Sequence, residues 1–251
     1  MSTRLTVLGT SGAWPEAGRA CSGYLVESDG FSLVLDLGFG TLPRLLSLCR
    51  AQDLAAVFIS HAHADHCVDL YGLYRALTLP EPPFPSPPIF AADEVVSRLA
   101  ALDRMGLDRF RRALDFRALG DRGSFEVGPF RLRTFELPHF TPNRGVRVEV
   151  GSDIIAYTGD TGPSDVIPEL ARGADLFICE STYPSPRDQE GPRLLLSAVE
   201  AGKYAREAGA KRLVLTHFWP GDDRSVSLVQ ARKSFAGEIT LAEEGTTFDL
   251  K

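Results

Sequence analysis

The chain has 251 residues, of which 44% are hydrophobic, 24% charged and 9% aromatic, a composition that excludes a disordered or fibrous protein. Lys and Arg number 27 against 33 Asp and Glu, and the net charge of −6 disfavours a non-specific nucleic-acid binder. A chain of this length buries enough surface to fold without a structural metal, so we expect any metal in it to be functional.

Short apolar runs typical of strands alternate with helical patterns from one end of the chain to the other. The predicted strands are 3–8, 23–27, 31–35, 55–60, 87–91, 125–136, 145–150, 153–158, 174–179, 211–216 and 238–249. The predicted helices are 41–50, 67–78, 93–105, 166–172, 193–208 and 227–236. No charge block or flexible linker interrupts this alternation, so we expect a single domain over residues 1–251 of the α/β (α+β) class.

The cysteines, the N-terminus and the apolar runs indicate where the protein works. The four cysteines show no C-x-x-C spacing, and the chain begins with an apolar strand instead of a signal sequence, so we expect a cytoplasmic protein. Cys67 is predicted to be buried as a small apolar residue. No run of about 18 apolar residues is present, and we expect no membrane association. The proline-rich segment 79–88 predicts an extended surface loop.

Three of the five histidines fall within the short segment Ser60-His61-Ala62-His63-Ala64-Asp65-His66, between a predicted strand and a predicted helix. His61 and His63 are two positions apart in an extended stretch and point to one side. Asp65 and His66 turn with the helix start and can face a second centre. Imidazole and carboxylate together suit zinc, with manganese or iron as alternatives. A solvated loop capped by Asp65 is the competing interpretation, but it leaves three clustered histidines unexplained.

A pair of metal ions needs more ligands than this loop supplies, and three residues elsewhere are candidates. His139 follows an alternating strand and a proline, and His217 ends the apolar strand Leu213-Val-Leu-Thr216. Asp160 lies between two glycines, which let the backbone approach closely. Taken singly, a histidine at a strand end is more often a satisfied polar residue, and Gly-Asp is more often a turn. Together with the histidine-rich loop, the three residues favour a site for two metals.

The order of these residues resembles that of the metallo-β-lactamase-fold hydrolases over essentially the whole chain: Asp36 at the end of an early strand, His61-x-His63-x-Asp65-His66, His139, Asp160 and His217. Within that superfamily the chain looks most like the ribonuclease Z-like branch. Three short elements carry this likeness: Gly145-Val-Arg147-Val-Glu149, Thr158-Gly-Asp-Thr161 and Glu180-Ser-Thr182. The resemblance implies a four-layer αββα sandwich with a site for two metal ions at one edge.

The resemblance also implies a role for each residue. One ion would be held by His61, His63 and His139, the other by Asp65, His66 and His217, with Asp160 bridging the two and Asp36 orienting the loop that carries the ligands. Zn²⁺ is the expected metal, with Mn²⁺ or Fe²⁺ as alternatives. The implied reaction is phosphodiester cleavage by a hydroxide that bridges the ions, with Asp65 and Glu180 as the catalytic residues: Asp65 accepts the proton of the attacking water, and Glu180 assists the leaving group.

Two departures from ribonuclease Z narrow the expected substrate. The long arm that grips tRNA in that family has no counterpart, because the segment from Glu149 to Tyr157 is short enough for only a hairpin. The family also places a histidine in the helix before the last ligand strand, where it pairs with the glutamate of the Glu-Ala/Ser-Thr element to protonate the leaving group. The matching position here is Leu195, and no sixth histidine exists to replace it.

The leading hypothesis is therefore a dinuclear metal-dependent hydrolase that cleaves a small or cyclic nucleotide-type phosphodiester. RNA is a less favoured substrate, through tRNA 3′-end processing with the arm supplied in trans. A lactone, thioester or lactam hydrolase is a further alternative, since the same metals serve those reactions. A metal-loaded binding or sensing protein with weak catalysis is the alternative that Leu195 motivates. The resemblance also allows a homodimer.

Overall fold

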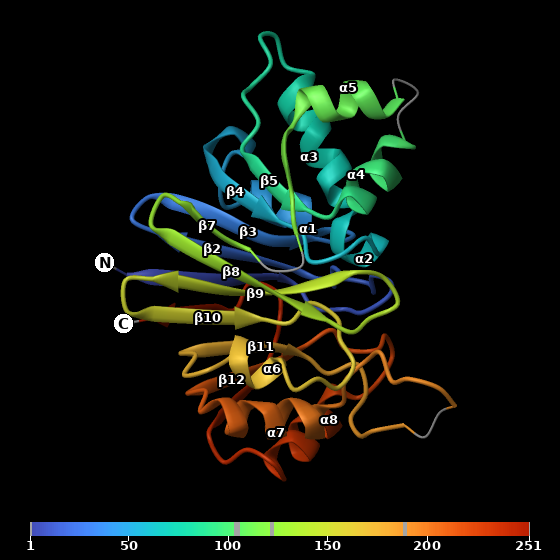
Figure 1. The fold of residues 1–251 in the computed structure, drawn as a ribbon, viewed down its shortest axis with the longest axis vertical. Coiled ribbons are helices and arrows are strands. Elements are labelled where there is room, and N and C mark those ends of the chain that lie inside the picture. Colours follow the sequence, from blue (N-terminus) through green and yellow to red (C-terminus); the bar gives the residue numbers. More distant parts are fainter. Residues whose placement is uncertain (1, 103–105, 121–122, 188–189, 251) are drawn as a thin grey trace.

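The computed structural model describes residues 2–102, 106–120, 123–187 and 190–250, which form two sheets of seven strands each (Figure 1). The first sheet has the order β14-β1-β2-β3-β4-β5-β6, with β1 (Thr3–Gly9), β2 (Gly23–Ser28), β3 (Phe31–Leu37), β4 (Leu54–Phe58), β5 (Pro88–Ala91), β6 (Asp115–Ala118) and β14 (Thr247–Leu250). The second has the order β13-β12-β11-β10-β9-β8-β7, with β7 (Ser124–Val127), β8 (Phe130–Leu137), β9 (Asn143–Val150), β10 (Asp153–Tyr157), β11 (Leu176–Glu180), β12 (Arg212–Thr216) and β13 (Glu238–Leu241).

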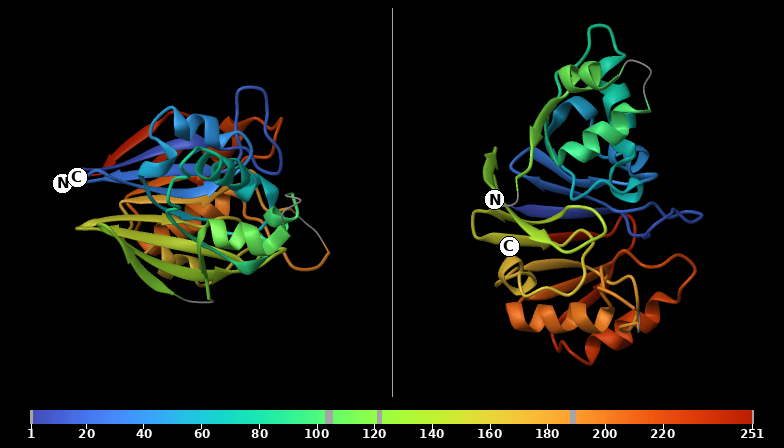
Figure 2. Two further views of the ribbon diagram at one scale, coloured as in Figure 1. Left: turned by 90° about the horizontal axis from the view of Figure 1, so that it is seen from above. Right: turned by 45° about the vertical axis from the view of Figure 1, so that its right-hand side comes forward.

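Helices cover the outer face of each sheet, as the views in Figures 1 and 2 show. The first sheet is covered by α1 (Thr41–Leu46), the 3₁₀ turn η1 (Ala51–Asp53), α2 (Ala64–Cys67), α3 (Asp69–Thr78), α4 (Asp93–Ala100) and α5 (Gly106–Ala113). The second is covered by α6 (Ile167–Leu170), α7 (Ala198–Ala208) and α8 (Arg224–Arg232). The four-layer αββα sandwich implied by the resemblance is thus confirmed. None of the helices in the described ranges has the length and apolarity that a membrane span requires.

Strands buried on both faces build the three apolar layers. In β4, Val57 packs under the helices of the first sheet, whereas Ala56 and Phe58 point into the space between the sheets. In β11, Ile178 shares that central layer, and Phe177 packs against α6 and α7 on the other side. Successive side chains of a strand point to opposite faces, so a continuous apolar run satisfies two layers at once. The central layer therefore draws residues from both sheets and fixes them face to face.

The structure corrects several predicted elements. The predicted strand 125–136 is two strands, β7 and β8, because Gly128 turns the chain with a φ of +54°. The predicted strand 238–249 is also two strands, and they lie in different sheets. Helix α5 and strand β6 were not predicted. Within the predicted helix 93–105 the described helix ends at Ala100, and positions 103–105 lie outside the described residues.

The structure also corrects where helices α7 and α8 begin. The predicted helix 193–208 begins at Ala198, where Ser197 and Glu200 form a reciprocal capping box that fixes the first turn. The predicted helix 227–236 begins earlier, at Arg224, because the Asp223 carboxylate accepts a hydrogen bond from the backbone N–H of Ser225.

The proline-rich segment 79–88 has no regular structure up to Pro88, where β5 begins, so the predicted loop is confirmed.

Candidate metal centre

The loop that follows β4 changes from extended to helical backbone at His63. This residue has φ −72° and ψ 145°, and α2 begins at the next position. His61 and His63 therefore project from extended chain, whereas Asp65 and His66 project from the first turn of a helix. The local sequence thus directs its two pairs of side chains to two different groups of residues.

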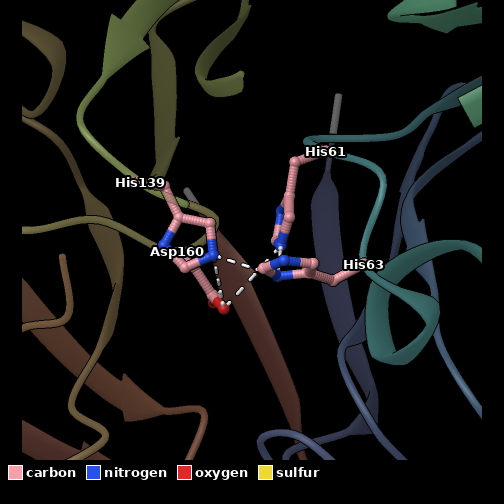
Figure 3. Close-up of side chains that lie close together, drawn as sticks. All are labelled: His61, His63, His139 and Asp160. Carbon is pink, nitrogen blue, oxygen red and sulfur yellow. Dashed lines mark hydrogen bonds and ion pairs between the residues drawn. The ribbon is translucent and has the colours of Figure 1, made fainter. Parts of the chain in front are cut away.

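Two groups of side chains with metal-binding atoms meet at this edge of the sandwich. The first contains His61, His63, His139 and Asp160, and the second contains Asp65, His66, His217 and Asp160; within each group one binding atom from every residue lies within 4.8 Å of the others. Figure 3 shows the three imidazoles and the carboxylate of the first group pointing toward one another. Asp160 belongs to both groups, which is the position that a bridging carboxylate requires.

The ring nitrogens of the first group face one another at hydrogen-bond distance. His63 Nδ1 lies 3.0 Å from His61 Nε2 and 3.1 Å from His139 Nε2. Burial lowers the pKa of all three imidazoles, and it outweighs the opposing effect of Asp160. The three rings are therefore neutral at neutral pH, and each can offer a lone pair to a cation.

The second group contains two buried polar atoms that lack a hydrogen-bond partner among the described residues. His66 Nε2 and Asp160 Oδ1 lie 3.2 Å apart, and neither makes a hydrogen bond of acceptable geometry with the described residues. Unpartnered buried atoms of this kind are rare and costly, so a pair of them facing one another indicates a missing partner. A divalent cation with a preference for nitrogen and oxygen ligands fits both atoms. The residues present thus suit the metal ions that the fold family implies.

The carboxylates of the centre are ionised. Burial alone would raise the pKa of Asp65, but His66 and His217 lower it to about 2. For Asp160 the effect of burial is likewise outweighed, chiefly by His217 and His66, and its pKa is well below the usual value. The same carboxylates raise the pKa of His66 and His217 against the effect of burial. The two carboxylates therefore offer anionic oxygens that a cation can bind in place of the histidine protons.

Asp36 holds the loop from behind. Its fully buried Oδ2 accepts hydrogen bonds at 2.7 Å from His66 Nδ1, Ser60 Oγ and Tyr157 Oη, and its Oδ1 accepts one at 2.6 Å from the backbone N–H of Ser60. The bond to Nδ1 places the proton of His66 there and leaves Nε2 facing the centre. Asp36 itself has a φ of +60°, a left-handed conformation that this network stabilises.

His217 is held by a relay from β11. Its Nδ1 lies 2.9 Å from Thr182 Oγ1, which donates a 2.7 Å hydrogen bond to the Glu180 carboxylate. Glu180 also accepts bonds from the backbone N–H groups of Thr161 and Thr182, and it is fully buried. Burial raises its pKa to about 7, with a further contribution from Asp160. Glu180 is thus connected to His217 only through Thr182, and it does not line the pocket. Its predicted catalytic role stays a prediction.

The segment after β1 completes the centre, and the sequence analysis did not identify it. The backbone N–H of Ala13 donates a 2.7 Å hydrogen bond to Asp65 Oδ2, and Ala13 adopts a φ of +58° to do so. A Cβ on Gly12 would lie 2.7 Å from the ring of His217, so only glycine fits there. The signal in the sequence was Gly9-Thr-Ser-Gly12 directly after a buried strand, a run typical of close backbone approach.

Replacing Gly12 by Ala should displace the imidazole of His217. We expect the affinity for the second metal ion to fall by about 10- to 100-fold, the usual effect of disturbing a contact that orients a ligand. Competition with a chelator measures this affinity. Gly123→Ala is the control, because a Cβ there would meet only Thr134 Oγ1 at 3.4 Å. Equal affinity in the Gly12→Ala and Gly123→Ala variants would show that the contact with His217 is unimportant.

A pocket of about 320 Å³ opens onto both groups. It is lined by Ala13, His63, Ala64, Asp65, His139, Phe140, Asp160, Leu195, His217 and Trp219. Leu195 contributes an apolar wall, but it lies in the segment before α7 and not within the helix that the sequence analysis predicted there. Its neighbour Leu194 accepts a 2.8 Å hydrogen bond from His139 Nδ1 through the backbone carbonyl, which leaves His139 Nε2 directed at the centre.

Two of the sequence features lie away from the pocket. Arg147 of the Gly-x-Arg-x-Glu strand donates to the carbonyl oxygens of Leu170 and Arg172 and to Glu149, so it ties β9 to the segment of α6. Cys67 is buried, as predicted, and burial raises the pKa of its thiol to about 12. A protonated, enclosed thiol is unreactive, so Cys67 serves packing.

Comparisons with known proteins identify the family. A family model described as a beta-lactamase superfamily domain matches residues 23–218. The probable metallo-hydrolase YhfI of Bacillus subtilis is 29% identical over 250 residues, covering 98% of this chain and 99% of that protein. The crystal structure of YhfI has a TM-score of 0.87, with 99% of each chain covered.

Ribonucleases of the Z type are similar as well. Ribonuclease Z of Salinispora arenicola is 31% identical over 302 positions, covering 100% of this chain and 97% of that protein. The crystal structure of the short form of human tRNase Z is 25% identical with a TM-score of 0.75, and 98% of each chain is covered. The chain therefore belongs to the beta-lactamase superfamily and is a metallo-hydrolase of the metallo-β-lactamase fold, with ribonuclease Z among its relatives.

Proposed function

We infer that the protein is a dinuclear metal-dependent hydrolase that cleaves phosphodiester bonds of small or cyclic nucleotides. The observation that carries this proposal is the pair of ligand groups that share Asp160. His61, His63 and His139 would hold one ion, Asp65, His66 and His217 would hold the other, and Asp160 belongs to both groups. Zn²⁺ fits this set, with Mn²⁺ or Fe²⁺ as alternatives. When bound, two divalent ions supply Lewis-acid activation and neutralise the charge of a phosphate.

The side chains around the ions provide orientation and proton transfer. Asp65 lines the pocket and its carboxylate is ionised, so it has the protonation state that acceptance of a proton from an attacking water requires. The N–H of Ala13 fixes the position of Oδ2 during this transfer. Leu195 and the largely exposed Phe140 contribute apolar surface to the pocket.

The hairpin between β9 and β10 favours a small substrate over tRNA. Val150 and Asp153 are paired in register, and only Gly151 and Ser152 separate the two strands, so the hairpin predicted from the sequence is confirmed. The alignment with ribonuclease Z spans 302 positions against 251 residues here, so that relative carries residues without a counterpart in this chain. A pocket of about 320 Å³ lies at the small end of the range for small-molecule sites.

Turnover of a panel of substrates by protein of known metal content tests the proposal. We expect turnover of an activated phosphodiester and of 3′,5′-cyclic nucleotides, lost in His63→Ala, and little turnover of precursor tRNA, lactones or thioesters. Turnover of a lactone or thioester alone would instead favour that hydrolase class. No turnover of any diester at full dimetal occupancy would contradict the proposal and favour a sensing protein. The four cysteines are free and three of them are buried, which supports a reducing cytoplasm as the place where the protein acts. The single domain over residues 1–251 stays a prediction. The homodimer also stays a prediction.

Substitution of Leu195 tests how the leaving group is protonated. Leu195 lines the pocket beside His63 and His139, so an imidazole at this position faces the leaving group. We expect Leu195→His to raise kcat by about 10- to 100-fold on alkyl diesters with poor leaving groups, within the usual contribution of a general acid. Nitrophenyl diesters, whose leaving group needs no proton, should show no gain. An equal gain on both substrates would contradict this interpretation, and Leu195→Asn is the polar control.

A further inference from the structure

Two tryptophans from opposite ends of the sequence meet at the rim of the pocket. The chain contains two tryptophans in all, Trp14 after β1 and Trp219 after β12. Their ring centroids lie 5.2 Å apart in an edge-to-face arrangement with an interplanar angle of 83°. Trp219 lines the pocket, whereas Trp14 remains 47% exposed.

The backbone fixes the position of this pair. The N–H of Gly12 donates to the carbonyl of Phe218 at 2.9 Å, and the N–H of Phe218 donates to the carbonyl of Thr10 at 3.0 Å. The Arg224 guanidinium lies 4.6 Å from the centre of the Phe218 ring and donates a 2.9 Å hydrogen bond to Thr10 Oγ1. The two loops are therefore joined into one unit, which places the backbones of the two tryptophans side by side.

The indole of Trp219 has a second aromatic neighbour. Tyr183 lies 6.2 Å from it, centre to centre, and the Arg187 guanidinium stacks on the Tyr183 ring at 3.7 Å. Trp219 thus stands between Trp14 and Tyr183, and both neighbours limit its rotation. An oriented indole that borders a pocket offers a flat π-surface to a planar ring.

The other residues that line the pocket indicate which class of ligand carries the planar ring. None of the ten described lining residues is Lys or Arg, so a second phosphate or a charged headgroup finds no cationic side chain in the pocket. The anionic part of the ligand is then best placed at the metal centre, and an uncharged planar part suits the indole surface of Trp219. A nucleobase meets both conditions, because every base presents a π-face to an aromatic side chain.

We propose that Trp219, oriented by Trp14, is the stacking surface for the base of a nucleotide whose single phosphodiester lies at the metal centre. This assignment rests on the proposed phosphodiesterase function and adds the part of the substrate that determines specificity. Trp219 lies two positions after His217, so a base stacked on the indole lies beside the ligand groups. The preference is for nucleotides over base-free sugar phosphates, with tolerance among bases, because stacking does not read their hydrogen-bonding edges.

Tryptophan fluorescence tests the stacking without any need for turnover, because both tryptophans belong to the pair. We expect adenosine 5′-monophosphate to quench the fluorescence of the zinc-loaded protein, and ribose 5-phosphate to leave it unchanged. The quench should persist in Trp14→Phe, where Trp219 is the single reporter, and disappear in Trp219→Phe. No quench in the wild-type protein, or a quench that survives in Trp219→Phe, would overturn the proposal.

Kinetics on a matched pair of substrates give the second readout. In Trp219→Ala we expect kcat/KM for 3′,5′-cyclic AMP to fall by about 10- to 100-fold, the usual effect of losing one base–aromatic stack. The value for the same cyclic ribose phosphate without a base should not change. Phe84→Ala, which removes an exposed aromatic ring from the proline-rich loop, is the control for both substrates. An equal loss of kcat/KM on both substrates would overturn the proposal. A nucleotide-specific quench of fluorescence without turnover of any diester would support the stacking surface but contradict the proposed phosphodiesterase function.

Discussion

Asp160→Asn is expected to lower kcat/KM for phosphodiesters by at least about 1,000-fold and to reduce the metal content below two ions per chain. Asp160 is the one residue that both ligand groups share, so its substitution weakens both positions together. An amide lacks the negative charge that balances the cations. Two divalent ions contribute several kcal/mol to the stabilisation of a phosphoryl transition state, and each 1.36 kcal/mol is a factor of ten in rate.

Metal analysis and steady-state kinetics on the same samples check this result. Asp165→Asn is the matched control, because Asp165 is an exposed carboxylate of the same segment that belongs to neither ligand group. If the Asp160→Asn variant kept two ions and wild-type kcat/KM, the bridging role would be wrong.

Asp36→Ala is expected to lower the free energy of unfolding by about 3–5 kcal/mol, the range for removing one partner from a buried ionic network. The substitution leaves His66 Nδ1, Tyr157 Oη and both donors of Ser60 without their acceptor. Each unsatisfied buried donor costs about 1–3 kcal/mol, and relaxation of the cavity recovers part of the sum. Urea unfolding of the metal-free protein measures the effect independently of metal binding.

A second aspartate provides a control for the backbone. Asp29 also has a positive φ, +50°, but it is exposed in the turn between β2 and β3. Asp29→Ala therefore measures the cost of placing alanine in a left-handed conformation, because this substitution removes no buried hydrogen-bond network. A loss of stability in Asp36→Ala no larger than in Asp29→Ala would contradict the role assigned to the Asp36 carboxylate.

The sequence was informative where function depends on residue type and on strand ends. Three clustered histidines with the aspartate among them, two isolated histidines and an aspartate between glycines were sufficient to nominate every residue of the two ligand groups. Their order along the chain also carried the family resemblance that implied the four-layer sandwich. Element boundaries were less accurate, as at α7, where a capping box delays the helix start to Ala198.

The sequence was uninformative where a contact depends on packing across the fold. Nothing local to Glu180 shows that its carboxylate lies behind Thr182 and away from the pocket. Gly12 and Ala13 were missed for the same reason, because their partners His217 and Asp65 lie far away along the chain.

The sequence by itself thus determined the chemistry of the site: its candidate ligands, the class of metal they suit and the short hairpin on which the proposed preference for a small substrate rests. Only the tertiary structure decided how closely the side chains of each group approach, which two buried atoms lack a hydrogen-bond partner and where the two tryptophans meet. The physical reason is that ligand chemistry and strand alternation are properties of residues and their near neighbours. Distances between side chains from different strands are set by the packing of two sheets, which no single segment specifies.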